Sequence, residues 1–368
     1  MQNTNELIYQ IALTKLPHVG VITGKKLLHY FGNARDIFEA STKEILALQG
    51  IQARLKKSFE ERDKWLEFAE REIEFITTQN IQTVFITDEH YPFRLKSNKD
   101  SPLMLYAKGQ MDFNRPKIVG MVGTRNPSTY GKQMVRSILE GFQDRAITVI
   151  SGLAFGVDIE VHKACLDLGI PTVGIMGSSF DFIYPDVHTP VAKQMMQGDN
   201  AVVTEYTSGS KPDRENFPMR NRIIAGMVDA LVVVESKETG GSMITASMAD
   251  GYNRTVFAVP GRSMDANSRG CNYLIKTRKA ELIQSAEDLI YEMEWGQASR
   301  KSVQLSLFQE LNEEERLIFN LIQREQVITL DELSDLTEMS PSNLANHLLQ
   351  MEFRGLLVSR PGKRYELV

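Results

Sequence analysis

Basic and aromatic side chains are interleaved in one short stretch of the chain, KPDRENFPMRNR, at residues 211–222. It follows an apolar run, AVVTEY, and leads into a second one, IIAGMV. Guanidinium forks pair with phosphates, and an exposed ring gives a nucleic-acid base a stacking surface worth about 1–3 kcal/mol. The spacing therefore predicts contacts with an unpaired nucleic-acid strand, made by Lys211, Arg214, Phe217, Arg220, Asn221 and Arg222.

A structural role is the alternative for part of this stretch. Phe217 would then belong to the core, and Arg222 would form a buried ion pair with a carboxylate such as Glu205 or Glu235. Because Arg222 stands at the head of an apolar helix, the sequence leaves both roles open for it.

Three glycine-rich loops add backbone amides to this chemistry. They are VGTRNPSTYG, SGLAFGVD and ETGGSMITA, and each follows an apolar run. Glycine allows a close approach of the backbone, and amides at the start of a helix attract anions. We expect nucleic-acid contacts from Gly123, Thr124, Arg125, Ser151, Gly152, Phe155, Gly156, Gly240, Gly241 and Ser242.

The loops do not match the fingerprints of nucleotide cofactors. The first apolar run is not followed by GxGxxG, and the chain contains no GxxxxGK[ST]. We therefore expect no cofactor. The two cysteines, Cys165 and Cys271, lie far apart without metal-ligand spacing, so we expect no metal site either.

Signals for catalysis are weak. Asp158 and His162 share a helix face at i, i+4, but no nucleophile is placed beside them, so a capping or packing role is expected. The loop ETGGSMITA is similar to the PGGxGTxxE loop of nucleotide phosphoribohydrolases, with Thr245 near the position of the glutamate. We expect no enzyme. A nucleoside monophosphate phosphoribohydrolase-like enzyme on the same sheet edge is the alternative, and an adaptor with a vestigial DNA pocket is a third possibility.

The elements that position these loops alternate between apolar runs and helical segments. Runs without polar alternation indicate strands buried on both faces of a parallel sheet, whose carboxyl ends meet at one edge. The runs are KIVGMVG (117–123), ITVISG (147–152), PTVGIMG (171–177), AVVTEY (201–206), ALVVVES (230–236) and RTVFAVPG (254–261). Residues 81–109 read as strand, turns and strand, and we place them in the same domain.

Length and composition fit a globular chain of several domains. The 368 residues are 42% hydrophobic and 24% charged, with a net charge of −5, so a polyanion must be held by a local patch. No apolar run approaches membrane-spanning length, and we expect a cytoplasmic protein without a membrane partner. The predicted domains are helical (1–80), sheet-containing (81–295), a linker (296–310) and a carboxyl-terminal domain of three helices and a β-wing (311–368).

Taken together, the motifs are similar to those of one family. The series VGTR, SGLAFGVD, MGSSFDFIYPDVH, TEYTSGSKP, NFPMRNRIIAG, ESKETGGSMITA, VFAVPG and SRGCNYLI resembles the DprA/Smf family of DNA-processing proteins in order and spacing over residues 117–275. The resemblance implies an extended Rossmann-like domain that binds single-stranded DNA and forms a homodimer. It implies a recombination mediator, not an enzyme, that protects incoming single strands and helps load the recombinase RecA during natural transformation.

The resemblance also assigns residues and flanking domains. The family's DNA contacts would fall on Arg125, the SGLAFG amides, Arg214, Phe217, and Arg220 or Arg222. The amino-terminal domain looks like a helix-hairpin-helix or SAM-like module, with His18 in place of the first hairpin glycine, so that duplex binding and a packing role both stay open. The carboxyl-terminal domain looks like a winged helix with a partner-binding or weak DNA-binding role.

Overall fold

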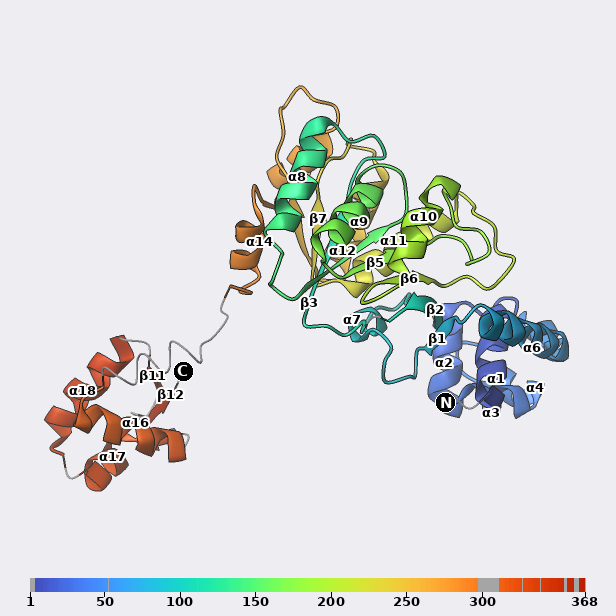
Figure 1. Cartoon of the computed structure of the whole chain (residues 1–368). Coiled ribbons are helices and arrows are strands. Elements are labelled where there is room, and N and C mark those ends of the chain that lie inside the picture. The colour runs from blue at the N-terminus through green and yellow to red at the C-terminus, as the bar shows by residue number, and fades with distance from the viewer. Residues whose placement is uncertain are drawn as a thin grey trace. The chain divides into compact units, whose positions relative to one another are not determined.

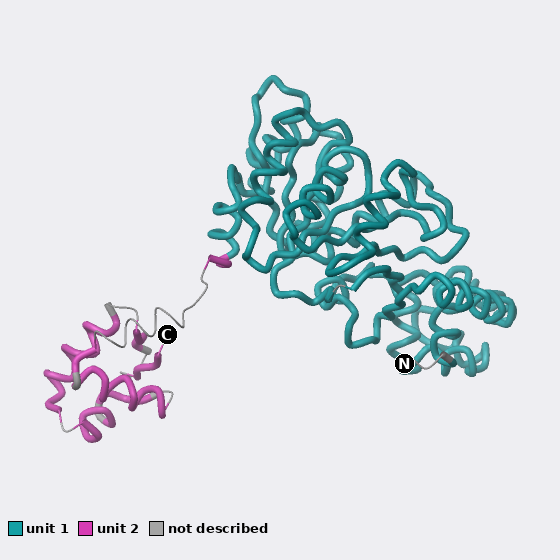
Figure 2. Tube along the Cα trace, viewed as in Figure 1, with its two compact units in different colours: residues 1–293 teal, residues 294–368 magenta. Residues whose placement is uncertain are grey.

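The computed structural model describes residues 4–51, 53–110, 112–296, 311–325, 327–337, 339–353, 356–360 and 364–367. The chain divides into two compact units, 1–293 and 294–368 (Figure 2). The first unit contains a large sheet with helices, and the second contains helices with a small sheet (Figure 1). Residues 297–310 of the expected linker lie outside the described residues.

The first unit is built on a nine-stranded sheet in the order β1-β2-β6-β5-β4-β3-β7-β8-β9. All neighbours from β6 to β9 are parallel, whereas β1 and β2 pair antiparallel with each other and β2 pairs antiparallel with β6. The strands are β1 (Gln82–Phe85), β2 (Met104–Gly109), β3 (Lys117–Val122), β4 (Ile147–Gly152), β5 (Thr172–Ile175), β6 (Ala201–Thr204), β7 (Ala230–Val233), β8 (Thr255–Ala258) and β9 (Glu281–Leu282).

The strand order reverses at β3, because β4, β5 and β6 follow on one side and β7 and β8 on the other. Right-handed crossovers in opposite directions place helices on both faces of the sheet. Accordingly, α8 packs beside α9 and α14, whereas α11 packs beside α12 and α7. The helices are α7 (Phe93–Lys96), α8 (Thr129–Glu140), α9 (Val157–Leu168), the 3-10 turn η1 (Asp186–His188), α10 (Thr189–Met195), α11 (Asn216–Met227), α12 (Gly241–Gly251), α13 (Arg269–Lys276) and α14 (Ala286–Glu292). The expected extended Rossmann-like architecture is confirmed.

The amino-terminal helices belong to the same unit and share its core. Leu27 of α2 and Leu105 of β2, for example, are both fully buried in one hydrophobic cluster. The helices are α1 (Thr4–Lys15), α2 (Val21–Phe31), α3 (Ala34–Glu39), α4 (Thr42–Ala47), α5 (Leu55–Glu60) and α6 (Arg62–Thr78). The boundary near residue 80 stays a prediction.

The hairpin between α1 and α2 is mostly exposed, whereas α2 itself packs against the rest of the unit. His18 adopts a positive φ of 63°, the left-handed conformation that favours glycine. A Cβ on Gly24 would lie 2.3 Å from Leu103 Cδ1, so α2 packs closely on the segment before β2. The role of the hairpin itself stays a prediction.

The second unit has the expected three helices and β-wing. The small antiparallel sheet has the order β10-β12-β11, and Ile318, Phe319, Leu333 and Leu344 lie in its core. Asn312 caps the first helix by accepting a hydrogen bond from the Glu315 amide at 2.8 Å. The elements are α16 (Glu313–Glu325), β10 (Val327–Thr329), α17 (Leu330–Thr337), α18 (Pro341–Phe353), β11 (Leu357–Arg360) and β12 (Arg364–Leu367).

Within the described parts of both units, no helix combines the length and the apolar character that crossing a bilayer requires. A search of the same residues finds no group of His, Cys, Asp and Glu side chains that would hold a metal ion. Cys165 and Cys271 are buried free thiols.

Candidate nucleic-acid interface

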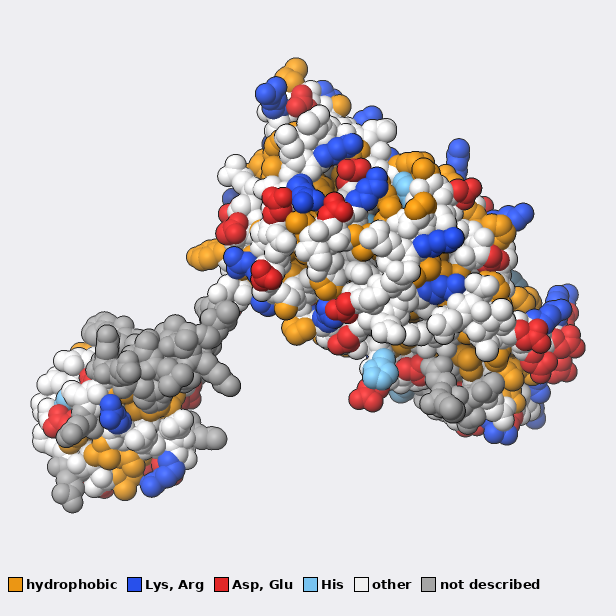
Figure 3. Space-filling model, in the orientation of Figure 1, with side chains coloured by type: hydrophobic (Ala, Val, Ile, Leu, Met, Phe, Trp, Pro, Cys, Tyr) orange, Lys and Arg blue, Asp and Glu red, His pale blue; other side chains and the backbone are white. Residues whose placement is uncertain are grey.

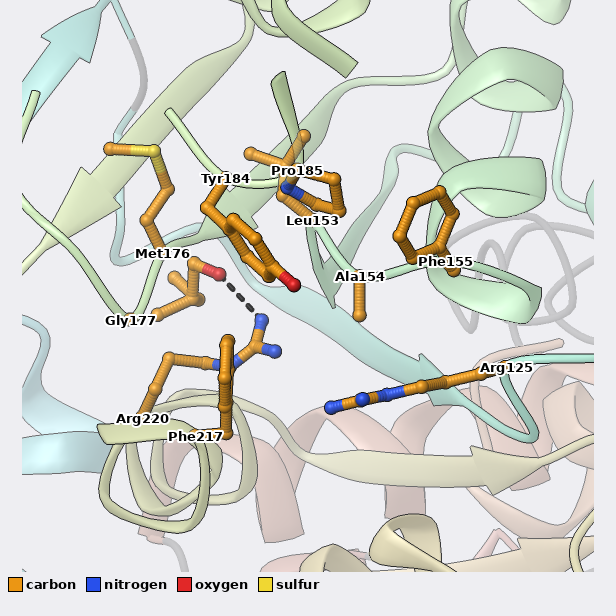
Figure 4. A pocket seen from close by; sticks show the side chains of 11 residues that line it. Arg125, Leu153, Ala154, Phe155, Met176, Gly177, Tyr184, Pro185, Phe217 and Arg220 are labelled. Carbon is orange, nitrogen blue, oxygen red and sulfur yellow. Dashed lines mark hydrogen bonds between the residues drawn. The ribbon is translucent and has the colours of Figure 1, made fainter. Parts of the chain in front are cut away.

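A small pocket lies where β3, β4 and β5 end and α11 begins (Figure 4). Four residues expected from the sequence line it, namely Arg125, Phe155, Phe217 and Arg220. They come from two loops and one helix, so the sheet brings together side chains that are far apart in the chain. The other lining residues are Leu153, Ala154, Ile175, Met176, Gly177, Tyr184 and Pro185.

Aromatic rings and a guanidinium face one another in this pocket. The ring centroids of Tyr184 and Phe217 are 5.8 Å apart, and Arg125 Cζ lies 5.4 Å from the Phe217 centroid. Figure 4 shows the Arg125 side chain reaching toward Phe217 across the mouth of the pocket. Phe155 and Tyr184 are 47% and 44% exposed, which is unusual for large aromatic side chains. The arrangement offers stacking surfaces beside a positive charge.

Arg125 is held in place by close contact between two backbones. Gly156 has φ 87°, and a Cβ there would lie 2.2 Å from the Thr124 carbonyl oxygen and 2.5 Å from Arg125 Cα. The Val157 amide donates a hydrogen bond to the same Thr124 oxygen at 3.1 Å. Only glycine fits this position, and its absence of a side chain lets the loop after β4 support the loop that carries Arg125.

Arg220 lies in the wall of the pocket as a buried charge. Its side chain is 5% exposed, Nη1 donates to the Ile175 carbonyl at 2.6 Å, and Nη2 lies 4.0 Å from Asp158 Oδ2. A Cβ on Gly152 would lie 1.8 Å from Nη1, so this glycine makes room for the guanidinium. Burial lowers the pKa of Arg220 and raises that of Asp158, and the attraction between the two opposes both shifts. Among the described residues, Nε of Arg220 has no hydrogen-bond partner.

Arg222 does not belong to this pocket, and its expected DNA contact is wrong. The residue is 3% exposed and forms an ion pair with Glu205. Burial raises the pKa of Glu205, and the nearby Arg222 counteracts that rise. Arg222 follows Arg220 by two residues on α11, so its side chain is rotated by about 200° around the helix axis and points toward the core. The structural alternative is therefore the correct one for Arg222.

The expected anion cradle at the start of α8 is already filled. The Glu235 carboxylate accepts hydrogen bonds from the Ser128 amide at 2.8 Å and the Ser128 hydroxyl at 2.6 Å. The Thr124 amide donates to the Glu235 carbonyl at 2.7 Å. A carboxylate at a helix amino terminus satisfies its free amides and its dipole. The Thr124 and Ser128 amides therefore have partners within the protein, and the Arg125 side chain is what this loop presents to the pocket.

In the third glycine-rich loop, ETGGSMITA, the polar side chains also have hydrogen-bond partners within the protein. The Ser242 hydroxyl, which is buried, donates to Ser236 Oγ at 2.8 Å. Gly240, Gly241 and Ser242 are not part of the lining of the pocket around Arg125. Thr245 is buried and its hydroxyl donates to the Gly241 carbonyl at 3.4 Å, so its side chain has a structural role.

His162 has the packing role that the sequence indicates. It is fully buried, with Nδ1 2.8 Å from Thr172 Oγ1 and Nε2 2.6 Å from the Gly152 carbonyl oxygen. Burial lowers its pKa to about 4, so the ring is neutral at physiological pH. Its hydrogen bonds support the loop after β4, which does not fit a general base.

The remaining expected residues surround the pocket or support it. Lys211 and Arg214 are exposed in the segment before α11, and Asn221 is half-buried. Ser151 is buried and its hydroxyl donates to the Met121 carbonyl at 2.6 Å, so it joins β4 to β3. Sequence reasoning missed Tyr184 as a lining residue, although the aromatic residue before Pro185 in the loop after β5 was a usable signal.

Charges of both signs are mixed on the surface over the first helices of the sheet domain. On the face in Figure 3, Lys and Arg side chains are interspersed with Asp and Glu over α8 and α9. The net charge of −5 agrees with this mixture.

Comparison with known proteins places this geometry in a family. The family model described as DNA recombination-mediator protein A matches residues 82–294, more than half of the chain. The chain belongs to this DprA/Smf family of recombination mediators. A second model, the DprA winged helix domain, matches residues 308–363 and agrees with the fold of the second unit.

Individual DprA relatives support the assignment. The chain is 39% identical to DNA processing protein DprA of Bacillus subtilis over 58% of this chain and 72% of that protein. It is 32% identical to DprA of Streptococcus pneumoniae over 80% of this chain and 100% of that protein.

Two solved DprA structures are similar as well. The structure from Streptococcus pneumoniae has a TM-score of 0.68 at 31% identity and covers 77% of this chain and 97% of that one. The structure of DNA processing protein A from Helicobacter pylori, which concerns its single-stranded DNA binding mode, has a TM-score of 0.53 at 27% identity and covers 58% of this chain and 95% of that one.

Proposed function

We propose that this chain is a non-catalytic mediator that binds single-stranded DNA in the pocket around Arg125. One observation carries the proposal: the Arg125 guanidinium lies 5.4 Å from the Phe217 ring centroid, in a pocket that also presents the exposed rings of Phe155 and Tyr184. Guanidinium and ring side by side suit a nucleotide, because one contacts the phosphate and the other stacks on the base. A duplex hides the faces of its bases, so the ring favours an unpaired strand.

The outer part of the proposed site is basic. Lys211 and Arg214 are exposed in the segment that leads into Phe217, and they would contact phosphates of neighbouring nucleotides. Arg220 also lies in the wall of the pocket, where the nearby Asp158 partly offsets its positive charge. We place the strand along the edge of the sheet where β3, β4 and β5 end.

The biological role that we propose goes beyond binding. The chain would protect incoming single strands and help load RecA during natural transformation, as a homodimer formed through its Rossmann-like domain. Membership of a recombination-mediator family supports this role. The enzyme alternative receives no support from the site, because no carboxylate follows the glycines in the loop ETGGSMITA.

The binding proposal is tested by titrating labelled oligo-dT and a matched duplex at two salt concentrations. We expect preference for the single strand, weaker binding at high salt, and a loss of more than about tenfold for Arg125→Glu. Lys132→Glu is the control, because Lys132 is exposed on α8 and the charge change is the same. Equal binding by wild type and Arg125→Glu would show that the pocket is assigned wrongly.

The mediator role needs a separate assay. RecA filament formation on single strands coated with a single-strand-binding protein should accelerate when the chain is added, and Arg125→Glu should remove most of the acceleration. Incubation with nucleoside monophosphates should release no base, and clear turnover would favour the enzyme alternative.

A further inference from the structure

The segment between β6 and α11 is held by the amino-terminal helices. Glu72, in the middle of α6, is 3% exposed, and its carboxylate accepts hydrogen bonds from the Ser208 amide at 2.9 Å and from the Ser208 hydroxyl. Lys15, at the end of α1, donates from Nζ to Thr207 Oγ1 at 3.2 Å. Two charged side chains from the helices thus hold adjacent residues of this segment.

The same segment is held from the other side by the loop after β5. The Gly209 amide donates to Asp181 Oδ2 at 2.7 Å, and the Ser179 amide and hydroxyl donate to the Ser210 carbonyl at 3.1 and 3.0 Å. This loop continues to Tyr184, which lines the pocket. Residues 207–210 therefore connect the amino-terminal helices with the wall of the proposed DNA site.

Glu72 is an unusual residue for its position. The neighbouring buried residues of α6 on this side are Ala69 and Ile76, so an apolar residue would be expected between them. A buried carboxylate costs free energy unless hydrogen bonds satisfy it, and both oxygens of Glu72 bond to Ser208. An apolar side chain would pack as well without fixing the segment, which points to positioning as the function of the carboxylate.

Phe217 stands only a few residues after this anchor. Ser210 ends the held part, and the exposed Lys211 and Arg214 lie between it and Phe217. A Cβ on Gly177 would lie 3.4 Å from Phe217 Cδ1, so the ring also rests against the loop after β5. A displacement of residues 207–210 would therefore reach both the cations and the stacking ring.

We propose that Glu72 is a positioning residue for single-strand binding, acting through Ser208 and not through contact with DNA. The inference depends on the proposed function of the pocket. The amino-terminal helices then have a defined task, which is to keep the segment with Lys211 and Arg214 in the conformation that binds the strand.

The test compares Glu72→Ala with Glu74→Ala, which removes the same charge from an exposed site on α6. Loss of a negative charge by itself strengthens binding to a polyanion, so electrostatics and positioning predict opposite directions for Glu72→Ala. If the freed segment adopts the binding conformation about a fifth to a tenth of the time, apparent affinity for oligo-dT falls by about five- to tenfold. Glu74→Ala should bind as well as wild type or slightly better.

Hydrogen exchange gives a readout that a general loss of stability would not reproduce. In Glu72→Ala, the amides of residues 207–210 should exchange faster while those of β3 and β4 keep their protection. Glu72→Gln retains an oxygen that accepts from the Ser208 amide, and it should recover most of the affinity. If Glu72→Ala does not fold, Ser208→Ala replaces it, with an expected loss of about twofold because only the hydroxyl contact is removed.

The outcomes separate this inference from the proposed function. If wild type binds oligo-dT, Arg125→Glu does not, and the Glu72 and Ser208 variants bind like wild type, the positioning role is wrong and the pocket stands. If wild type itself does not bind oligo-dT, the proposed function fails and the positioning role fails with it.

Discussion

Replacement of Phe217 by alanine isolates the stacking part of the proposed site. The ring is half-buried in the first turn of α11, between Arg125 and Tyr184, and it has no charge. Alanine is a good helix former, so the backbone of α11 should remain intact. The variant removes a stacking surface and leaves the cations in place.

The expected loss can be stated from the contacts of the ring. One base stacked on an aromatic side chain contributes about 1–3 kcal/mol, which corresponds to an increase in Kd of about 5- to 150-fold. The cation–π contact with Arg125 exists in the free protein too, so its removal adds little to the difference between free and bound states. We expect a value in the lower half of this range, because Phe217 is partly covered before DNA binds.

Fluorescence anisotropy with labelled oligo-dT at several salt concentrations measures the affinity and its dependence on salt. The slope of log K against log salt reflects phosphate contacts, so Phe217→Ala should lower affinity without changing the slope. Arg125→Ala should reduce the slope by about 0.7, the value for one phosphate contact on a single strand. Met219→Ala is a control, since Met219 is 49% exposed on the same turn of the helix.

Two results would refute the reasoning. Binding of Phe217→Ala within about twofold of wild type would mean that the ring does not stack on a base. A reduced salt slope in this variant would mean that the substitution displaces Arg125, so that the two side chains do not contribute separately.

Three further substitutions test the internal structure. Gly156→Ala should lower the free energy of unfolding, measured in urea, by more than about 2 kcal/mol, because φ is 87° and the new Cβ has no room. Gly251→Ala is the control and should be tolerated, because a Cβ at Gly251 would meet open space. Arg222→Met should cost about 3 kcal/mol by leaving the Glu205 carboxylate buried without its cation, while the folded protein keeps its affinity for oligo-dT. His162→Gln removes a group whose pKa is lowered to about 4 on folding, so the stability of wild type relative to this variant should fall by up to about 3 kcal/mol as pH decreases from about 6.5 to 4. A constant difference over that pH range would contradict the burial of a neutral imidazole.

The sequence was sufficient for the central sheet because its signal is local. Apolar runs such as 147–152 and 230–236 have no polar alternation, and each became a strand that is fully buried. Parallel strands bring the following loops to one edge, so the meeting of Arg125 and Phe217 followed from topology. The orientation of β1 and β2 could not be predicted in this way, because it depends on pairing between β2 and β6, which are far apart in the chain.

Which arginine of α11 lines the pocket could not be predicted from neighbouring residues in the sequence. Arg220 and Arg222 are two residues apart and chemically identical, yet one lines the pocket and the other pairs with Glu205. The phase of α11 decides between them, and the sequence alone does not fix it, because residues 222–227 of α11 are buried on every side of the helix. Tyr184 was missed for a related reason, since the loop after β5 reaches the pocket only once it folds back against the segment before α11.

The carboxylate of Glu235 at the beginning of α8 changes what this sheet edge selects. Many open α/β proteins keep that place vacant for the diphosphate of a dinucleotide. Here a side chain supplies the negative group permanently, and a soluble cofactor would have to expel it. A diphosphate at this helix end would therefore meet the negative charge of Glu235 in place of free amides.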